Sequence, residues 1–233
     1  MLIHNSDLDA SSFTKSKGFY HEEFKTVLKL LIFCYNEILN LETPQSYEKG
    51  FKLENHLRNV LVKNYLRKYK ERYGISYLGF EIESGEIDIN DVTVGFIDIK
   101  VVNAGLATSM KCDEDVYYAI ECKRLDKYSS KISKYVEEGI LRFINGKYSN
   151  NMPLAGMLGF IEKNTPDIIL GKIIDKLNNE KCINTINNLD NCVLQDDFEY
   201  SYLSKHERKD PLGPIDIYHL LFDYTSLILI EED

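Results

Sequence analysis

Apolar side chains recur every three to four residues in four separate stretches of the chain. These stretches cover residues 22–40, about 52–73, 129–143 and 166–177. On a helix this spacing places the apolar positions on a single stripe, which other parts of the protein have to cover. The pattern therefore predicts four helices, each with one buried side.

Between the predicted helices, short segments alternate apolar and polar residues or carry β-branched and aromatic runs, which is typical of strands. Asn90-Asp91 interrupts the first of these segments and predicts a hairpin turn. Residues 42–50, 103–114 and 178–191 are polar or contain proline and glycine, which predicts exposed connections. The predicted strands cover residues 77–102, 117–124, 154–161, 198–203 and 215–230.

The order of these elements predicts an α/β protein in which helices flank a mixed β-sheet. At 233 residues, 44% of them hydrophobic, the chain is long enough for one large domain with appended segments. We expect an N-terminal helical segment over residues 1–50 and a central core over residues 51–165. A C-terminal α+β extension over residues 166–233 is expected to pack on that core.

Asp98, Glu121 and Lys123 are the residues that point to chemistry. Glu121 and Lys123 share one face of their strand, because side chains alternate along a strand. If this strand pairs with the one that carries Asp98, the two carboxylates lie about 5 Å apart. Carboxylates that close repel each other unless a cation lies between them, and oxygen ligands suit Mg²⁺. A lysine beside that cation can orient or deprotonate a water and stabilise negative charge on a phosphate.

This arrangement resembles the PD-(D/E)xK nuclease superfamily, also called restriction-endonuclease-like. Asp98 and the run Glu121-Cys122-Lys123 match the motif, and Ile97 stands in place of the proline, at a position that varies in the family. Residues 135–148 and 152–160 are similar to segments of nucleases linked to bacterial phage defence.

The resemblance covers about residues 50–165 and implies a metal-dependent nuclease with a restriction-endonuclease-like core. Asp98 and Glu121 would hold one or two Mg²⁺ ions, with the main-chain carbonyl of Cys122 as a further ligand. Lys123 would assist the attacking water, and Mn²⁺ is expected to substitute for Mg²⁺. The implied substrate is nucleic acid, with DNA ahead of RNA, in antiviral defence or restriction.

Two further carboxylates are candidates for the metal site. Glu54 lies one turn before Leu57 on the inward stripe of its predicted helix, where a carboxylate is costly unless it is paired or binds a metal. Related nucleases often supply such a glutamate from the first core helix. The alternative is that Glu54 lies at the start of the helix and faces water. Asp88 is a rival to Asp98, but its longer connection to Glu121 ranks it second.

Four basic residues are candidates for binding the substrate. Arg142 can bind a phosphate or pair with Glu138, one turn earlier on the same predicted helix. Lys147 follows the end of that helix, where the helix dipole favours a cation in any case. His206 and Arg208 are candidates to line the cleft, although a lone histidine is more often structural.

The net charge of −9 argues against a protein that binds a polyanion strongly by itself, since nucleic-acid-binding domains usually carry a basic surface. Basic residues cluster only locally, in residues 63–72 and 123–134. We therefore expect weak DNA binding by the lone chain and stronger binding by a homo-oligomer or with a partner such as a helicase or ATPase. The same charge supports an alternative, a catalytically inactive nuclease-fold subunit that binds a protein partner.

The sequence contains no apolar run of the ~20 residues that a membrane span needs. Residues 1–17 are polar and lack the apolar core of a signal peptide, which predicts a cytoplasmic protein with no membrane contact. The five cysteines include no C-x-x-C pair, so they predict neither a zinc site nor a disulfide framework.

Overall fold

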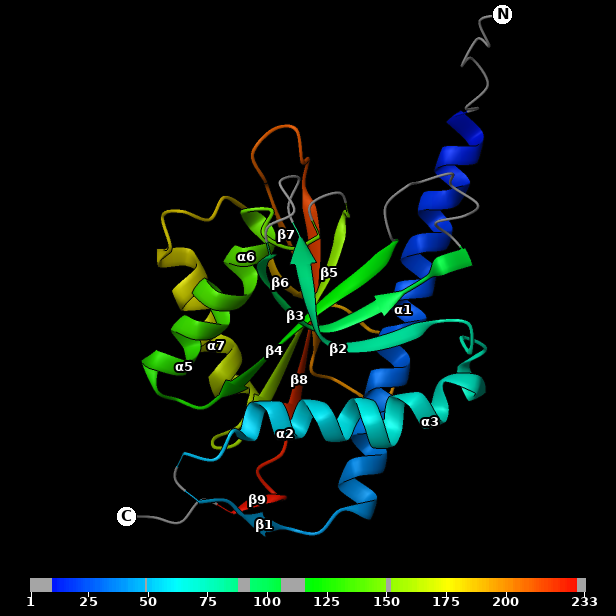
Figure 1. Ribbon diagram of the computed structural model, residues 1–233. Helices are drawn as coiled ribbons and strands as arrows, with labels where there is room; N and C mark the ends of the chain where they lie inside the picture. The colour runs from blue at the N-terminus through cyan, green and yellow to red at the C-terminus, as the bar shows by residue number, and fades with distance from the viewer. Residues whose placement is uncertain (1–9, 49, 88–92, 106–115, 150–151, 230–233) are drawn as a thin grey trace, which may run out of the picture.

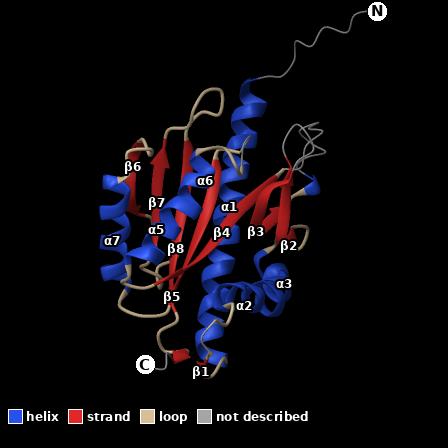
Figure 2. Ribbon diagram, turned by 60° about the vertical axis from the view of Figure 1, so that its left-hand side comes forward, coloured by secondary structure: helices blue, strands red, loops and turns tan. Residues whose placement is uncertain are grey.

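The computed structural model describes residues 10–48, 50–87, 93–105, 116–149 and 152–229. These residues form one seven-stranded mixed sheet with the order β2-β3-β4-β5-β8-β7-β6, flanked by helices on both faces (Figures 1 and 2). The predicted α/β class is therefore confirmed. The strands of this sheet are β2 (Gly79–Ile87), β3 (Thr93–Val102), β4 (Tyr117–Leu125), β5 (Leu154–Ile161), β6 (Thr185–Asn191), β7 (Ser201–His206) and β8 (Ile215–Asp223).

The direction of strand pairing changes across the sheet. β2, β3 and β4 are antiparallel neighbours, β4, β5 and β8 are parallel, and β8, β7 and β6 are again antiparallel. A short parallel pair, β1 (Gln45–Ser46) with β9 (Ile228–Leu229), lies apart from this sheet. The single strand predicted over residues 215–230 is thus two strands, β8 and β9. The C-terminal strands continue the same sheet as the central strands, with β8 directly beside β5.

Helices form a layer on each side of the sheet, with α1, α2 and α3 on one side and α5, α6 and α7 on the other (Figure 2). A π-helical turn continues α2 into α3, and a second one continues α5 into α6. The helical segments are α1 (Ala10–Leu41), α2 (Leu53–Val60), η1 (Leu61–Leu66), α3 (Arg67–Tyr69), η2 (Lys70–Tyr73), α5 (Ser129–Tyr135), η3 (Val136–Ile140), α6 (Leu141–Ile144) and α7 (Pro166–Asn179).

Alternation along β4 decides which side chains face which helical layer. Ile120 and Cys122 belong to the buried core beneath α1 and α2. Ala119 belongs to the core on the opposite side of the sheet, with α5, α6 and α7. Glu121 and Lys123 continue the series of Ala119, so they face the layer of α5 and α6.

Most of the predicted elements are confirmed, with shifted ends. β5 has the predicted bounds, and α1 begins at Ala10 rather than at residue 22. The prediction of an exposed connection over residues 178–191 is wrong in part, because Thr185–Asn191 forms β6. This strand lies at an edge of the sheet that the described residues form and exposes most of its side chains, so its sequence is as polar as that of a loop. The predicted turn at Asn90-Asp91 lies outside the described residues, while β2 and β3 on either side of it pair antiparallel.

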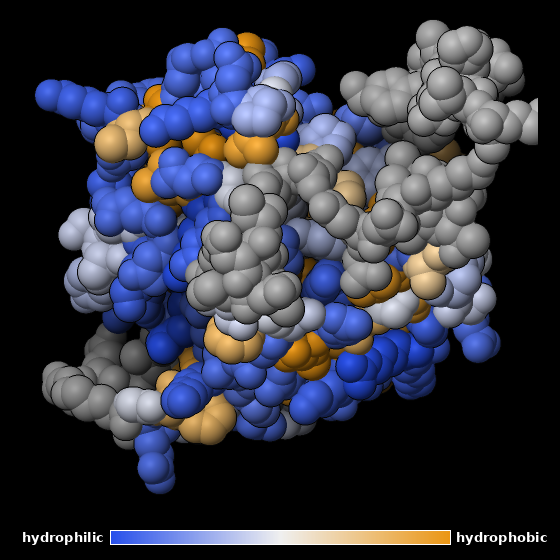
Figure 3. Space-filling view, turned by 45° about the horizontal axis from the view of Figure 1, so that its top comes forward, coloured by the Kyte–Doolittle hydropathy of each residue, from blue (hydrophilic) through white to orange (hydrophobic). Residues whose placement is uncertain are grey.

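The surface shown in Figure 3 is mainly hydrophilic, with hydrophobic side chains in small separate areas. Large apolar side chains that are exposed include Phe19, Phe96, Ile168 and Val193, which come from different segments of the chain. None of the described helices is both long and apolar enough to cross a membrane.

Candidate metal-binding and catalytic site

β3 and β4 form a fork, and Asp98 lies where they separate. Their ladder runs from Val102, opposite Tyr117, to Ile99, opposite Ile120. Beyond this pair the Cys122 N–H of β4 donates to the side chain of Asp98, at Oδ2 and 2.9 Å, where a continued ladder would offer a backbone carbonyl. This bond holds Asp98 beside the part of β4 that carries the E-x-K run, as the pairing of the two strands requires.

Lys123 lies between the carboxylates at this fork. Its Nζ is 3.2 Å from Glu121 Oε1 and 3.5 Å from Asp98 Oδ2, and it donates to the Cys122 carbonyl at 2.9 Å. Burial alone would lower the pKa of Lys123, but the adjacent carboxylates outweigh burial and raise it above its ordinary value. Lys123 is therefore an ammonium here. In this form it can donate hydrogen bonds to a water or to an anion and stabilise negative charge.

Glu121 is the most deeply buried carboxylate of the fork, with only 1% of its side chain exposed. Its Oε1 accepts from Arg142 NH1 at 2.7 Å and from Lys123 Nζ at 3.2 Å. Its Oε2 is buried and has no hydrogen-bond partner among the described residues. Burial first, and then the nearby charge of Asp98, raise the pKa of Glu121 to about 7. An unpaired buried oxygen on such a group is a ligand position that a cation would satisfy.

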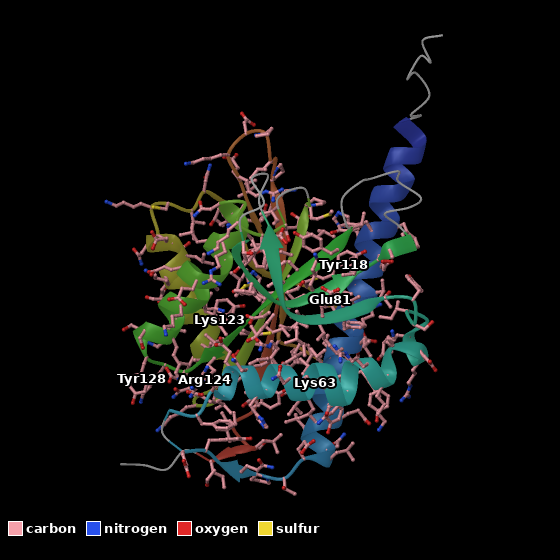
Figure 4. All side chains as sticks on the ribbon, in the orientation of Figure 1. Lys63, Glu81, Tyr118, Lys123, Arg124 and Tyr128 are labelled. Carbon is pink, nitrogen blue, oxygen red and sulfur yellow. The ribbon has the colours of Figure 1, made fainter. Side chains whose placement is uncertain are left out.

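Glu54 turns toward this fork from the first turn of α2. Its Oε2 accepts a hydrogen bond from the Arg124 N–H at 2.9 Å, and its Oε1 is 3.9 Å from Lys123 Nζ. Figure 4 shows Arg124 beside the start of α2, on the strand that also carries Lys123. The Arg124 side chain pairs with Glu162 at 2.6 Å. The structure thus places Glu54 at the carboxylates rather than out in solvent.

Arg58 and Glu83 belong to the same site, although the sequence analysis missed them. Arg58 NH1 is 2.6 Å from Asp98 Oδ1 and its NH2 is 2.8 Å from Glu83 Oε1, while only 2% of the Arg58 side chain is exposed. Burial lowers the pKa of Arg58, but its bonds to Glu83 and Asp98 reverse this and raise it. One signal was available, because Arg58 follows Glu54 by one helical turn on the same inward stripe. A charged residue there needs a partner.

Arg142 reaches the fork from α6 and binds Glu121, not Glu138 as one alternative had predicted. Its NH1 also donates to Tyr148 Oη at 3.2 Å, and that hydroxyl donates to the Phe96 carbonyl at 2.9 Å. These bonds tie the helix that follows the motif to β3, on the opposite side of the fork. Arg142 is 28% exposed, so it lies where the site opens to solvent.

The corner occupied by Tyr148 depends on a glycine in β3. A Cβ atom at Gly95 would lie 2.6 Å from Tyr148 Oη and 2.8 Å from Lys147 Cε, which is closer than such atoms can approach. A side chain at position 95 would therefore force Tyr148 and Lys147 to move. Lys147 lies at the same corner, with its Nζ 5.9 Å from the centre of the Tyr148 ring.

His206 and Arg208 make no bond to the carboxylates of this site among the described contacts, so the structure gives no support to the expectation that they line the cleft. His206 is buried and bonds to Ser204 and Thr185. Arg208 is also buried and donates to the carbonyls of Ser149, Leu212 and Gly213 at 2.8–2.9 Å. Both side chains are satisfied within the fold. Asp88, the rival of Asp98, lies outside the described residues.

The charges at the fork form one connected group, which we call the charged cluster. Four carboxylates face three cationic side chains, which leaves a net negative charge. Among the described residues, no three histidine, cysteine, aspartate or glutamate side chains are arranged as a ready-made metal site. Asp98 and Glu121 with the Cys122 carbonyl nevertheless supply hard oxygen donors of the type that Mg²⁺ takes, and Glu121 Oε2 is free to accept it. The members of the charged cluster are Glu54, Glu83, Asp98, Glu121, Arg58, Lys123 and Arg142.

Comparison of the chain with protein-family models, with curated proteins and with solved structures finds no match in any of the three.

Proposed function

We propose that this protein is a Mg²⁺-dependent nuclease of the restriction-endonuclease-like type that hydrolyses phosphodiester bonds in DNA. The observation that carries the proposal is the buried, unpaired Oε2 of Glu121 beside Asp98 and Lys123 at the fork of β3 and β4. Arg58, Lys123 and Arg142 offset repulsion among the carboxylates, but a buried acceptor without a partner is still costly. A divalent cation at Glu121 Oε2 would remove that cost.

The order of the elements around the charged cluster also supports the proposal. α2, β2, β3, β4, the helix from α5 to α6, and β5 follow one another in the chain. This is the α-β-β-β-α-β order of the superfamily core that the motif suggested. The two segments similar to phage-defence nucleases lie mainly in η3, α6 and β5, next to the charged cluster. That likeness is the basis for proposing a role in antiviral defence or restriction.

In the proposed reaction, Asp98, Glu121 and the Cys122 carbonyl would hold the ion, and Glu54 would complete the set. A bound Mg²⁺ would polarise the phosphate and lower the pKa of a bound water. Lys123, as an ammonium, would donate to the attacking water or to a phosphate oxygen and stabilise the charge that develops there. Arg142, at the open side of the charged cluster, would exchange its bond to Glu121 for a phosphate oxygen of the substrate.

Replacing Asp98 or Lys123 by alanine tests this proposal. We expect Asp98→Ala and Lys123→Ala to abolish Mg²⁺-dependent cleavage of DNA while circular dichroism shows an intact fold. Lys63→Ala is the matched control, because Lys63 is an exposed lysine of η1, one turn beyond the end of α2 that carries Glu54 and Arg58, and it makes no bond to the charged cluster among the described contacts. Full cleavage by a pure, folded Asp98→Ala protein would show that the assignment is wrong.

A second function, a nuclease-fold subunit without catalysis, has one specific observation in its favour. Cationic side chains already bind Asp98 and one oxygen of Glu121, as they would in a site that no longer takes a metal. Calorimetric titration with Mn²⁺ separates the two functions, because the subunit predicts no heat of binding at the charged cluster and a stable complex with another protein. Loss of the heat in Asp98→Ala would favour the nuclease.

The net charge of −9 bears on how such a nuclease reaches DNA. A negative overall field repels a polyanion even where a site is locally basic. We therefore also propose that the lone chain binds DNA weakly, and that a homo-oligomer or a partner with a basic surface, such as a helicase or ATPase, supplies the missing affinity. Anisotropy measurements at physiological salt, with Ca²⁺ to block cleavage, should show weak binding. Tight binding by a proven monomer would contradict this.

A further inference from the structure

Glu83 and Asp98 occupy opposite positions on β2 and β3. Ile82 pairs with Ile99 and Ser84 with Ile97, so the residues between these pairs face each other across the ladder. Like charges placed directly opposite each other on neighbouring strands are destabilising. Arg58 separates the two carboxylates, with one terminal nitrogen on each, at 2.6 and 2.8 Å.

The backbone of Glu83 is strained. Its φ angle is +52°, in the left-handed region that is unfavourable for a residue with a side chain. Glycine would adopt this angle without strain. The glutamate side chain, however, reaches Arg58 and also lies 3.5 Å from the Asn55 amide, contacts that a glycine would lose. The strain is thus tied to a contact at the charged cluster, where strained residues often have functional roles.

Arg58 occupies an oxygen of Asp98 that a metal ion would need. Oδ1 of Asp98 accepts from Arg58, and its Oδ2 accepts from the Cys122 N–H. The side chain of Asp98 is 14% exposed, whereas the side chain of Glu83 is 54% exposed. Glu83 can therefore turn in solvent to receive both terminal nitrogens of Arg58, while Asp98 stays fixed by β4. A guanidinium binds a single carboxylate well in this two-pronged way.

We propose that Arg58 competes with the divalent cation for Asp98, and that Glu83 takes over Arg58 when the cation binds. This regulation of metal loading rests on the proposed nuclease function. It makes Glu83 a positioning residue that leaves Asp98 free for the metal. Removing Glu83 should weaken metal binding, because Arg58 then has Asp98 as its main partner. Removing the charge of Arg58 should strengthen metal binding.

Calorimetric titration with Mn²⁺, without nucleic acid, tests this inference on the full chain. We expect Glu83→Gln to weaken the Mn²⁺ affinity about tenfold and Arg58→Gln to strengthen it about tenfold. A tenfold change is what the gain or loss of one moderate charge–charge interaction produces. Glu81→Gln is the matched control. It removes the same charge from the same exposed side of β2, and Glu81 bonds to Ser84 rather than to the charged cluster. Its Mn²⁺ affinity should equal that of the original protein.

Glu83→Gly separates this role from a merely structural one. Glycine relieves the strain at φ +52°, which offsets the lost bond to Arg58, so the melting temperature should stay close to that of the original protein while the Mn²⁺ affinity still falls. Should Arg58→Gln fail to fold, the two Glu83 variants decide the question. If the Mn²⁺ affinity of Glu83→Gln is unchanged, or falls no further than that of Glu81→Gln, the role of Arg58 and Glu83 is contradicted while the proposed nuclease function still stands. If the original protein does not bind Mn²⁺, the proposed nuclease function is contradicted, and the inference that rests on it as well.

Discussion

Two buried polar groups lie on the two halves of the sheet, and they are built in opposite ways. The charged cluster lies at β3 and β4. On β7 and β8 lies a neutral series that we call the histidine chain. In it, Tyr135 bonds to His219, His219 to Ser204, and Ser204 to His206, each at 2.8–2.9 Å, and His206 bonds to Thr185 at 3.2 Å.

The histidine chain uses both ring nitrogens of each histidine. Burial lowers the pKa of His206 to about 4, and burial with the neighbouring His206 lowers that of His219 to about 3, so both rings are neutral near pH 7. A neutral imidazole donates at one nitrogen and accepts at the other, which lets every bond run in one direction along the series. Each of the four ring nitrogens therefore has a partner within the series.

The charged cluster, in contrast, is incomplete. Glu121 Oε2 and Arg58 Nε are buried without a hydrogen-bond partner among the described residues, and Glu83 has a strained backbone. Departures of this kind are expected at functional sites, because a fully satisfied group has no capacity left for a substrate or metal. Both groups are polar and buried, and they differ in that only the charged cluster combines unpartnered buried atoms with a strained backbone.

The largest expected effect follows from replacing the unpaired carboxylate. We expect Glu121→Gln to reduce Mg²⁺-dependent cleavage at least ~1000-fold, at the upper end of what loss of one stabilising group costs. Its thermal stability at pH 8 should not fall, because the ionised carboxylate is disfavoured where burial raises its pKa to about 7. Cleavage assays and calorimetric melting measure the two effects. Activity above a tenth of the original would remove Glu121 from the mechanism.

The matched change in the histidine chain is Ser204→Ala. It leaves a nitrogen of His206 and a nitrogen of His219 buried without their partner, which costs roughly 2 kcal/mol. For a protein of this size the melting temperature should fall by about 4–8 °C. Cleavage measured well below that temperature should match the original protein. Loss of cleavage with unchanged stability would show that the histidine chain takes part in function.

The pH dependence of stability should also differ between the two regions. The pKa of each histidine is lower in the folded protein than its ordinary 6.5, so the unfolded chain binds more protons below pH 6.5. Their stabilising effect is complete above pH 6.5 and falls with pH toward 4, by up to about 1.4 kcal/mol per pH unit for each histidine. Glu121 acts in the opposite sense, because its pKa is raised from 4.5 to about 7. The folded protein therefore binds a proton at Glu121 more readily than the unfolded chain does, which increases stability as the pH falls from about 7 toward 4.5.

Urea denaturation between pH 5 and 7.5 can separate these two contributions. Glu121→Gln lacks the carboxylate whose protonation stabilises the folded protein at lower pH. Its loss of stability toward pH 5 should therefore be steeper than that of the original protein. His206→Gln in the same background should make the loss shallower. A pH profile that is identical in all three proteins would mean that neither buried group titrates as described.

Much of the fold was predictable because it depends on local repeats. Helical stripes predicted α2 through η2 and α5 through α6, and an unbroken apolar run predicted β5 with its bounds. The polar edge strand β6 could not be distinguished from a loop, because its exposed side chains leave no apolar pattern.

The site was predictable where chemistry followed the strand pattern, as for Asp98, Glu121 and Lys123. Arg58 and Glu83 were not predicted, because their roles depend on ion pairs formed in the folded protein and on one unusual φ angle. No repeat or motif in the sequence indicates which residues Arg58 pairs with or that Glu83 has a positive φ angle. His206 and Arg208 were placed at the site from residue type alone. Residue type could not show that the partners of both lie within the fold.

The smallest expected effect concerns how far the charged region extends along the surface. Lys127 is exposed just beyond β4, with its Nζ 6.0 Å from the ring centre of the exposed Tyr128. If Lys127 contacts one phosphate, Lys127→Ala should weaken DNA binding a few-fold and reduce the slope of log affinity against log salt by about 0.9. Lys209→Ala is the control, because Lys209 is exposed near the end of the histidine chain. Anisotropy titrations in Ca²⁺ at several salt concentrations measure both slopes. Equal slopes for the two variants would mean that DNA does not approach the charged cluster past Lys127. A smaller slope in Lys127→Ala alone would show that the surface beside the charged cluster binds DNA and that the surface beside the histidine chain does not.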